Sequence, residues 1–322
     1  MKTHFADRLL EAVQQKQVPA CVGLDPLVER FPAKLLREHH IATTEDGHIE
    51  PGTPGEKITA ALGHFGREVL RTIAPLVPVV KINIAFFERY YADGIRVYGE
   101  LVRCAHELGL LVIGDVKRAD IGHSATQYAH AHLGEIPPWV GTGILNPDAV
   151  TVNPYFGFDA IRPFVEVGMG SGRGLFVLVQ TSNESAPEIQ DLALADGSTV
   201  SEHVARRVHA WSAEGDRLGV CGYRLIGAVV SPRDAASTAR LRALMPHAVF
   251  LVPGFGAQGR TVEDVAPCFK PDGTGALVTA SRSVIYAHAD APYRDRFGDD
   301  WVRCLEAGCA AFVEALQGLR GR

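Results

Sequence analysis

The sequence predicts a single α/β domain built as a closed (β/α)8 barrel, the TIM barrel. Short apolar or β-branched runs alternate with longer helical patterns along the 322 residues, as expected for a parallel sheet with helices outside it. Eight such runs occur, each followed by a helical pattern, and the length suits eight βα units. A doubly wound open sheet is the structural rival, but no G-x-G-x-x-G motif follows the first run to support it.

The predicted strands are short runs rich in apolar and β-branched residues, which favour strands. They cover residues 20–24, 79–84, 110–116, 149–152, 175–180, 225–230, 248–252 and 275–279. The predicted helices follow the strands in turn and carry apolar residues at helical spacing. They cover residues 55–73, 86–108, 120–132, 158–167, 198–213, 232–245, 260–269 and 301–316.

The segment before the first strand is predicted to be an amphipathic helix over residues 4–16. Phe5, Leu9 and Val13 recur at helical spacing, and charged residues run throughout the segment, which distinguishes it from a signal peptide. No apolar run of the sequence is long enough to span a bilayer. We therefore expect no membrane association.

Three long connections, near residues 37–53, 133–147 and 183–197, are predicted insertions. In a barrel such loops would form lids or decorations of the rim. No internal repeat beyond the βα alternation and no linker divide the chain, so we expect one domain over residues 1–322.

Composition points to a cytoplasmic protein that does not bind nucleic acid. Apolar residues make up 47% and charged residues 21%, enough for a large core, and the net charge is −5. No run of Lys or Arg exceeds two residues, so the basic footprint of a nucleic-acid-binding surface is absent from the sequence. The six cysteines are scattered without a C-x-x-C pair, which is typical of reduced thiols in the cytosol.

Charged residues follow the first three predicted strands, where a barrel places its functional groups. Asp25 follows the first strand, Lys81 lies near the end of the second, and the third ends in Asp115-Val116-Lys117. Because side chains alternate along a strand, Asp115 and Lys117 share one face. The pattern predicts a carboxylate and an ammonium side by side at the mouth of the barrel.

By itself, a D-x-K pattern is more typical of a solvated ion pair. Likewise Asp120, where the chain turns into the next helix, is in a natural N-cap position. However, the pattern follows the apolar run 110–113 at the expected end of a strand, and two other strand ends supply Asp25 and Lys81. This combination favours a functional site.

A phosphate site is predicted after the last two strands. The stretch P-G-F-G-A-Q-G-R at residues 253–260 opens a helix; glycines permit close backbone approach, and a helix N-terminus favours an anion. The eighth strand ends in T-A-S-R-S at residues 279–283, where Arg282 can bind phosphate through two nitrogens. A Gly-rich turn alone is usually only a tight connection, but these two loops are the usual phosphate site of the fold. We expect a phosphorylated small-molecule ligand.

Two further strand ends carry polar groups. Thr181 and Ser182 follow the fifth strand and offer hydroxyl groups that could read a polar ring. Asn153 follows the fourth strand and serves either the ligand or the backbone of a turn; the sequence favours neither.

The histidines do not predict a metal site. His130 and His132 form an H-x-H pattern, but they lie in a predicted helix, where residues two apart face different directions; surface positions are expected for both. His39, His40 and His48 lie in an insertion without cysteine and without a recognisable ligand spacing.

These motifs together resemble the orotidine 5′-monophosphate decarboxylase family, from about residue 20 to residue 287. The matching motifs are D-V-K-R-A-D-I at 115–121 against the family's D-x-K-x-x-D-I, Asp25 in G-L-D-P, Lys81 in V-K-I-N, P-G-F-G-A-Q-G at 253–259 and Arg282 in S-R-S. The insertions and V-L-V-Q-T-S-N-E at 177–184 are similar to the longer, type 2 branch. Many relatives have Gly before the phosphate arginine, whereas this chain has Ser281.

The resemblance implies decarboxylation of orotidine 5′-monophosphate to uridine 5′-monophosphate, the last step of de novo pyrimidine biosynthesis, without a metal or other cofactor. The implied catalytic residues are Lys117, Asp115, Lys81 and Asp120, with Lys117 protonating a C6 carbanion. The implied substrate contacts are Asp25, Asn83, Ile121, Thr181, Ser182, Pro253, Gly254, Gln258, Gly259, Arg282 and Ser283, and either Ser182 or Thr181 reads the base. The family completes its site across a homodimer, so Asp120 would be donated by the neighbouring subunit.

Three alternatives remain at this stage. A magnesium-dependent sugar-phosphate decarboxylase or lyase of the same superfamily is the nearest, although such relatives have a metal-binding carboxylate where this chain has Lys81. A Schiff-base aldolase would use Lys81 or Lys117 as a neutral amine, which flanking carboxylates disfavour. A non-catalytic sensor of phosphorylated ligands would tolerate the loss of a charged strand-end residue, yet all are present.

Overall fold

Eight parallel strands close into a barrel in sequence order, with β1 paired to both β2 and β8. The computed structural model describes residues 3–135, 146–214, 218–256 and 259–319. The strands are β1 (Ala20–Leu24), β2 (Val79–Asn83), β3 (Leu111–Arg118), β4 (Ala149–Val152), β5 (Gly174–Gln180), β6 (Ile226–Val230), β7 (Phe250–Val252) and β8 (Ala276–Ala280). The predicted (β/α)8 barrel is confirmed, and each predicted strand overlaps an observed one.

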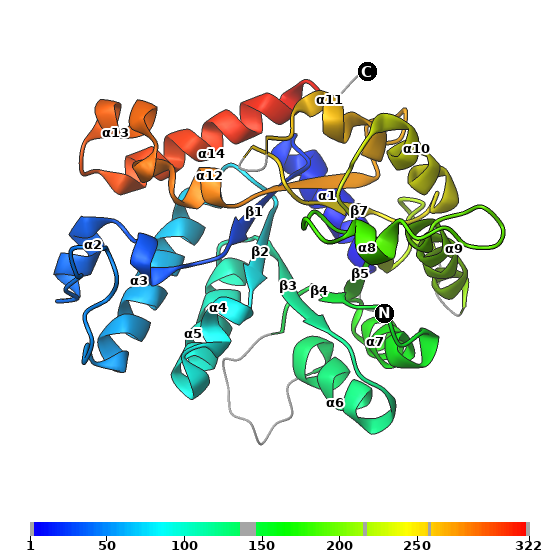
Figure 1. Cartoon of the computed structure of the whole chain (residues 1–322), viewed down its shortest axis with the longest axis horizontal. Coiled ribbons are helices and arrows are strands. Elements are labelled where there is room, and N and C mark those ends of the chain that lie inside the picture. Colours follow the sequence, from blue (N-terminus) through cyan, green and yellow to red (C-terminus); the bar gives the residue numbers. More distant parts are fainter. Residues whose placement is uncertain (1–2, 136–145, 215–217, 257–258, 320–322) are drawn as a thin grey trace.

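Helices surround the barrel (Figure 1). The α-helices are α1 (Phe5–Lys16), α2 (Ala33–Glu38), α3 (Gly55–Ile73), α4 (Ala85–Glu88), α5 (Tyr91–Glu107), α6 (Gly122–Leu133), α7 (Phe158–Ser171), α8 (Pro187–Gln190), α9 (Val200–Ala213), α10 (Ala235–Leu244), α11 (Val262–Val265), α12 (Arg282–Ile285), α13 (Ala291–Phe297) and α14 (Trp301–Gln317). The 3-10 turns are η1 (Val28–Arg30), η3 (Ala266–Cys268) and η4 (Ala287–Ala289).

The prediction of one helix over 86–108 is wrong, because the chain breaks between α4 and α5. Tyr91 has a positive φ of 53°, a left-handed conformation that interrupts a right-handed helix. The break brings the chain back so closely that a Cβ on Gly94 would lie 1.9 Å from the carbonyl oxygen of Phe87. Glycine at position 94 is what permits this approach.

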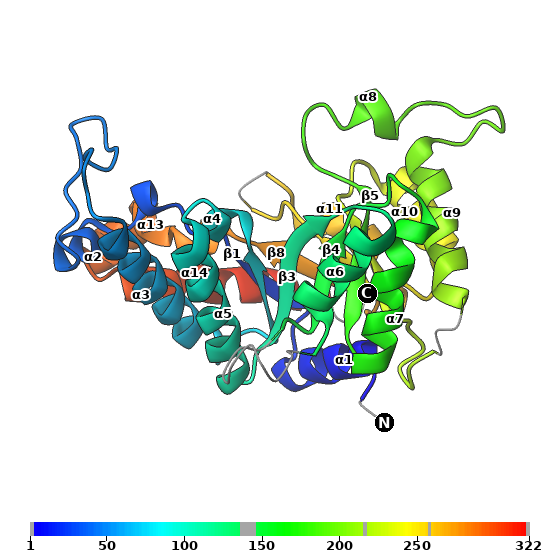
Figure 2. The same ribbon diagram turned by 90° about the horizontal axis from the view of Figure 1, so that it is seen from below.

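Helix α1 closes the N-terminal end of the barrel. The ring of Phe5 meets that of Phe176 edge-on at 6.0 Å, and a Cβ on Gly174, at the start of β5, would lie 2.2 Å from the Phe5 ring. Phe5 and Leu9 are buried. Figure 2 shows α1 at the end of the barrel opposite to α8. The apolar face predicted for this helix therefore covers the floor of the barrel.

Alternation along the strands divides the core into two parts. On β2, Val80 and Ile82 belong to the apolar layer between barrel and helices, whereas Val79 belongs to the cluster inside the barrel. The same parity turns Lys81 inward, and on β3 it places Asp115 on the inner face above Ile113. Strand periodicity thus delivers charged side chains to the mouth of the barrel.

Two of the segments predicted as insertions project on the side opposite to α1 (Figure 2). In the first, Thr43 pairs with Ile49 in an antiparallel bridge; in the second, Ala193 pairs with Thr199, which lies just after the predicted segment. Of the third, residues 136–145 lie outside the described part of the chain. In the described ranges, no helix is both long and apolar enough to cross a membrane.

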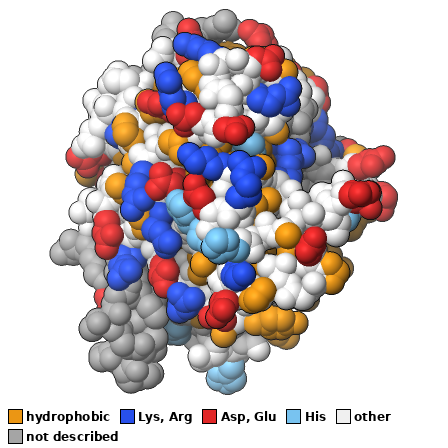
Figure 3. Space-filling model, turned by 90° about the vertical axis from the view of Figure 1, so that its left-hand side faces the viewer, with side chains coloured by type: hydrophobic (Ala, Val, Ile, Leu, Met, Phe, Trp, Pro, Cys, Tyr) orange, Lys and Arg blue, Asp and Glu red, His pale blue; other side chains and the backbone are white. Residues whose placement is uncertain are grey.

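The face that carries α2, α3 and α13 mixes basic, acidic and histidine side chains (Figure 3). Nε2 of His39 lies 3.0 Å from Nδ1 of His64. Elsewhere, His130 is exposed as predicted, but the predicted surface position of His132 is wrong: it is half-buried and accepts a hydrogen bond from Nε of Arg118 at 3.3 Å. Among the described residues, no group of three His, Cys, Asp or Glu side chains is arranged to hold a metal ion.

Candidate active site

A cavity of about 190 Å³ opens at the carboxyl ends of the strands. Its lining combines charged side chains with apolar and hydroxyl-bearing ones: Lys81, Asp115, Lys117, Thr151, Leu178, Thr181, Ser182, Val229, Leu251, Pro253 and Thr279. A larger cavity of about 350 Å³ lies at the opposite end, under α1, but the one ionisable side chain among its lining residues is Asp272. Of these two cavities, the one at the carboxyl ends of the strands is therefore the candidate for chemistry that needs several charged groups.

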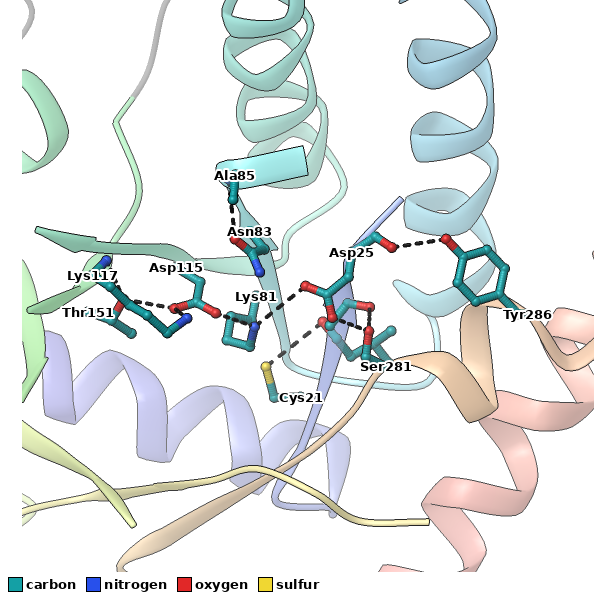
Figure 4. Close-up of polar contacts among 12 residues, drawn as sticks. Cys21, Asp25, Lys81, Asn83, Ala85, Asp115, Lys117, Thr151, Ser281 and Tyr286 are labelled. Carbon is teal, nitrogen blue, oxygen red and sulfur yellow. Dashed lines mark hydrogen bonds and ion pairs between the residues drawn. The ribbon is translucent and has the colours of Figure 1, made fainter. Parts of the chain in front are cut away.

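Asp115 binds two lysines at once (Figure 4). Its Oδ2 accepts a hydrogen bond from Nζ of Lys81 at 2.7 Å, and its Oδ1 accepts one from Nζ of Lys117 at 2.6 Å. On its other side, Lys81 lies 3.9 Å from Oδ1 of Asp25. The result is an alternating chain, Asp25–Lys81–Asp115–Lys117, in which the predicted pairing of Asp115 with Lys117 is observed.

Burial and the neighbouring charges shift the pKa values of Asp115 and Lys81 in opposite directions. Burial alone would raise the pKa of Asp115, but the ammonium groups of Lys81 and Lys117 outweigh it and hold that pKa well below its usual range. Burial alone would lower the pKa of Lys81, but the carboxylates of Asp115 and Asp25 raise it above its usual value. Both groups are therefore charged at neutral pH. The Lys117 side chain, in contrast, is about half exposed at the cavity mouth.

Lys117 departs from regular strand geometry. Its φ is +44°, a left-handed conformation that costs a residue with a side chain about 1–3 kcal/mol. The register between β3 and β4 shifts at this point, between Gly114 and Arg118. Thr151 on β4 compensates, because its Oγ1 accepts a hydrogen bond from the amide of Lys117 at 3.0 Å and donates one to Oδ1 of Asp115 at 2.8 Å. One hydroxyl thus joins the backbone of the lysine to its carboxylate partner.

Within one subunit, Asp120 is separate from the charged row Asp25–Lys81–Asp115–Lys117. Its Oδ1 accepts a hydrogen bond from the amide of Ile121 at 2.8 Å, and no contact among the described residues joins it to the two site lysines. Its predicted N-cap role is wrong: Ile121 is the N-cap of α6 and is still extended, with φ −114° and ψ 162°. The Ile121 side chain is exposed.

On the opposite wall, hydrogen bonds distinguish Thr181 from Ser182. The Thr181 hydroxyl accepts a hydrogen bond from Gln190 at 2.7 Å and donates one to Asn183 at 2.6 Å. Ser182 is exposed and also lines the cavity. The hydroxyl proton of Thr181 is therefore already used within its own loop. At the end of β4, Oδ1 of Asn153 accepts a hydrogen bond from the amide of Tyr155 at 3.1 Å. Of the two roles expected for Asn153, this is the one that stabilises the backbone of a turn.

The loops after β7 and β8 lie against each other. Pro253 lines the cavity, and Gly254 and Gly259 have positive φ angles of 97° and 76°, which glycine adopts without strain. A Cβ on Gly256 would lie 3.2 Å from Oγ of Ser283. Arg282 is exposed at the first position of α12. Gln258 lies outside the described residues.

Asn83 ends β2, and its Oδ1 accepts a hydrogen bond from the amide of Ala85 at 3.3 Å. It is paired in the sheet with Asp115. The structure thus brings Asp25, Lys81, Asn83 and Asp115 to one end of three adjacent strands. Both carboxylates of this group lie within ion-pair distance of Lys81.

Comparisons with known proteins agree with one another on the family. The model of the orotidine 5′-phosphate decarboxylase / HUMPS family matches residues 21–292. An orotidine 5′-phosphate decarboxylase from Rhodopirellula baltica is 38% identical over 319 residues, covering 98% of this chain and 99% of that protein. The chain belongs to the orotidine 5′-phosphate decarboxylase / HUMPS family.

Other members of the orotidine 5′-phosphate decarboxylase / HUMPS family support the same assignment. The orotidine 5′-phosphate decarboxylase of Caldicellulosiruptor saccharolyticus is 36% identical over 294 residues, which are 91% of this chain and 92% of that protein. The solved structure of Leishmania donovani OMP decarboxylase superimposes with a TM-score of 0.70 at 26% identity, covering 99% of this chain and 100% of that one.

Two residues of this family member's site escaped sequence reasoning. Thr151 is a polar residue within the apolar run A-V-T-V of β4. The alternation of side chains along this strand could have identified it as facing the inside of the barrel. Ser281 lies directly before Arg282 and contacts Asp25 across the seam between β8 and β1; no pattern in the sequence links positions so far apart.

Proposed function

We propose that this protein decarboxylates orotidine 5′-monophosphate to uridine 5′-monophosphate, the last step of de novo pyrimidine biosynthesis, without a cofactor. The observation that carries the proposal is the chain Asp25–Lys81–Asp115–Lys117 at the mouth of the barrel. An ammonium fixed beside the reacting carbon suits a reaction that builds negative charge there. The 38% identity with the Rhodopirellula baltica enzyme over nearly the whole chain supports the same substrate.

In this reaction the bond between C6 and the carboxylate carbon breaks, and the electron pair stays on C6 as CO₂ leaves. The ammonium of Lys117 stabilises the developing charge electrostatically, and it needs no reorganisation because Asp115 already holds it. Lys117 then transfers one proton to C6 and regains a proton from solvent. Asp115 also fixes the position of the ammonium that donates the proton.

The remaining cavity residues are proposed to hold the nucleotide. Asp25, Lys81 and the partner subunit's Asp120 bind ribose hydroxyls, and Ser182 reads the base because the Thr181 hydroxyl is already used within its loop. Arg282 and Gln258 bind the phosphate, with the backbone of the β7 loop around Gly254 and Gly259 approaching it closely. Asn83, Ile121, Pro253 and Ser283 complete the proposed contacts.

We further propose a cytoplasmic homodimer in which Asp120 enters the partner's site. Within one chain Asp120 is separate from the two site lysines, and the loops that follow β2, β3 and β4 expose large apolar side chains. The most exposed of these are Tyr91 (84%), Ile121 (56%), Tyr155 (80%) and Phe156 (51%). Exposed apolar side chains gathered around neighbouring strand ends are typical of an interface.

The test is to follow the ultraviolet absorbance change when purified protein is mixed with orotidine 5′-monophosphate in excess chelator. Turnover in chelator is expected. Turnover that disappears with chelator and returns with magnesium would contradict the cofactor-free reaction, and no turnover of this substrate at all would favour the sugar-phosphate lyases. Borohydride added with substrate is expected to leave the protein mass unchanged, whereas a trapped adduct would indicate a Schiff base.

A further inference from the structure

Ser281 is placed to control the carboxylate of Asp25 from the opposite side of the β1–β8 seam. Its Oγ lies 3.0 Å from the carbonyl oxygen of Gly23 and closer still to Oδ2 of Asp25. A hydroxyl has one proton to donate, and a charged acceptor makes the stronger hydrogen bond. The Ser281 hydroxyl therefore donates chiefly to Asp25.

Gly23 makes room for this contact. A Cβ at position 23 would lie 2.9 Å from Cβ of Ser281, closer than Cβ atoms normally approach other atoms in proteins, and 3.0 Å from its Oγ. The contact thus depends on a glycine on β1 and a serine after β8.

The backbone of Asp25 is held independently by Tyr286. The Tyr286 hydroxyl donates a hydrogen bond to the carbonyl oxygen of Asp25 at 2.9 Å and accepts one from the amide of Leu27 at 2.6 Å. With the backbone fixed in this way, the direction of the Asp25 carboxylate depends on what binds its two oxygens. Ser281 takes Oδ2.

Oδ1 of Asp25 is buried and has no hydrogen-bond partner among the described residues. It points toward Lys81 (Figure 4), whose Nζ lies 3.9 Å away, beyond hydrogen-bonding distance. A buried acceptor without a donor is unfavourable, so a donor from a ligand is the expected partner. The carboxylate is therefore oriented with its unused oxygen at the cavity wall formed by Lys81.

We propose that Ser281 is a positioning residue: by binding Oδ2 it turns Oδ1 of Asp25 toward a hydroxyl group of the bound nucleotide. Ser281 thereby gives the site its preference for a ribose over a sugar without hydroxyl groups. This inference rests on the proposed function, because it takes a uridine nucleotide as the ligand. It assigns Ser281 no contact with the reacting atoms.

The test compares the dissociation constants of uridine 5′-monophosphate and its 2′,3′-dideoxy analogue. One hydrogen bond to a charged group corresponds to roughly a tenfold difference in affinity or more, so the wild-type protein is expected to prefer the hydroxylated nucleotide at least by about that factor. In Ser281→Ala and Ser281→Gly the preference should fall to about threefold or less, with the affinity for the dideoxy nucleotide unchanged. In Asp25→Ala, adding Ser281→Ala should cause no further loss of preference.

Thr199→Ala is the matched control, since it removes a helix-capping hydroxyl from α9, outside the cavity. It is expected to lower Tm and to keep the preference. If Ser281→Ala and Ser281→Gly weaken both nucleotides equally, or keep the wild-type preference, Ser281 is only structural and the inference is overturned. A wild-type protein that neither binds uridine 5′-monophosphate nor turns over its precursor would overturn the proposed function and, with it, this inference.

Discussion

The ammonium nitrogen of Lys117 lies 2.6 Å from Oδ1 of Asp115. The carboxylate is buried and its other oxygen binds Lys81, so it cannot turn away from Lys117 without also losing its hydrogen bond to Lys81. A long, flexible lysine side chain at the cavity mouth is thereby held in one direction. Rigid placement of charge is what electrostatic stabilisation of a carbanion requires.

Lys117→Ala should remove both the stabilising charge and the proton donor. We expect kcat to fall by about 10³-fold or more, while the dissociation constant of uridine 5′-monophosphate changes by less than about tenfold. Steady-state assays and calorimetry measure the two quantities. Lys34→Ala, at an exposed position on α2, is the control and should leave both unchanged. Wild-type turnover in Lys117→Ala would show that the proton comes from another group.

Thr151→Val tests the hydroxyl that joins the Lys117 backbone to Asp115. The substitution keeps the shape of the side chain but removes one acceptor and one donor, so Lys117 should lose its fixed direction. We expect kcat to fall by about tenfold, the effect of one hydrogen bond to a charged group, with a smaller change in KM.

The matched control is Thr59→Val on α3, another buried threonine, whose hydroxyl bonds only to the preceding turn at 3.1 Å and 3.2 Å. Its kcat should stay at the wild-type value. Equal effects of the two substitutions on kcat would mean that Thr151 serves general stability and not the lysine.

Arg282→Ala tests the phosphate site with two substrates. For orotidine 5′-monophosphate, loss of a bidentate ionic contact should lower kcat/KM by about 10²-fold. For orotidine, which lacks the phosphate, kcat/KM should be the same in variant and wild type. Arg294→Ala on α13, also exposed, should affect neither substrate. An equal loss for both substrates would contradict a phosphate role.

Mixing two inactive variants tests whether Asp120 acts across the dimer. A heterodimer of Lys117→Ala and Asp120→Ala subunits contains one site with both wild-type residues if Asp120 comes from the neighbour, and none if it comes from the same chain. Random exchange should therefore restore about a quarter of the wild-type sites. Activity measured after mixing, against each variant alone, decides between the two. No gain after demonstrated subunit exchange would rule out the donation of Asp120 across the dimer.

Because of His132, the free energy of unfolding should fall at mildly acidic pH. Burial, together with the nearby Arg118 guanidinium, lowers its pKa from 6.5 to about 4. Because the unfolded chain then binds more protons than the folded one between these values, stability is present above about pH 6.5 and is lost as the pH falls toward 4. For a half-buried side chain we expect about 1–2 kcal/mol over this window.

Urea unfolding at pH 7 and pH 4.5 measures this effect. His132→Gln retains a neutral acceptor for Arg118 and should lose less stability on acidification than the wild type. His130→Gln, at an exposed position two residues earlier, should behave as the wild type. Identical acid sensitivity in all three proteins would contradict the role of His132.

Local periodicity was enough to predict the barrel and the core of the site. The alternation of side chains along β3 put Asp115 and Lys117 on one face, and the order of strand ends supplied Asp25 and Lys81. These features depend on residues close together in the chain, where the backbone geometry of a strand leaves little freedom. The same reasoning found the Gly-rich loop after β7 and Arg282 after β8.

The tertiary structure decided what depends on register between strands and on irregular backbone. Thr151 reaches Lys117 only because β3 and β4 shift register there, and Ser281 meets Asp25 only because β8 closes the barrel against β1. The left-handed residues Tyr91 and Lys117 likewise interrupt regular patterns. These contacts join residues that are distant in sequence, and they offset the cost of the irregular backbone. They follow from the packing of the whole chain, so no periodic pattern of the sequence predicts them.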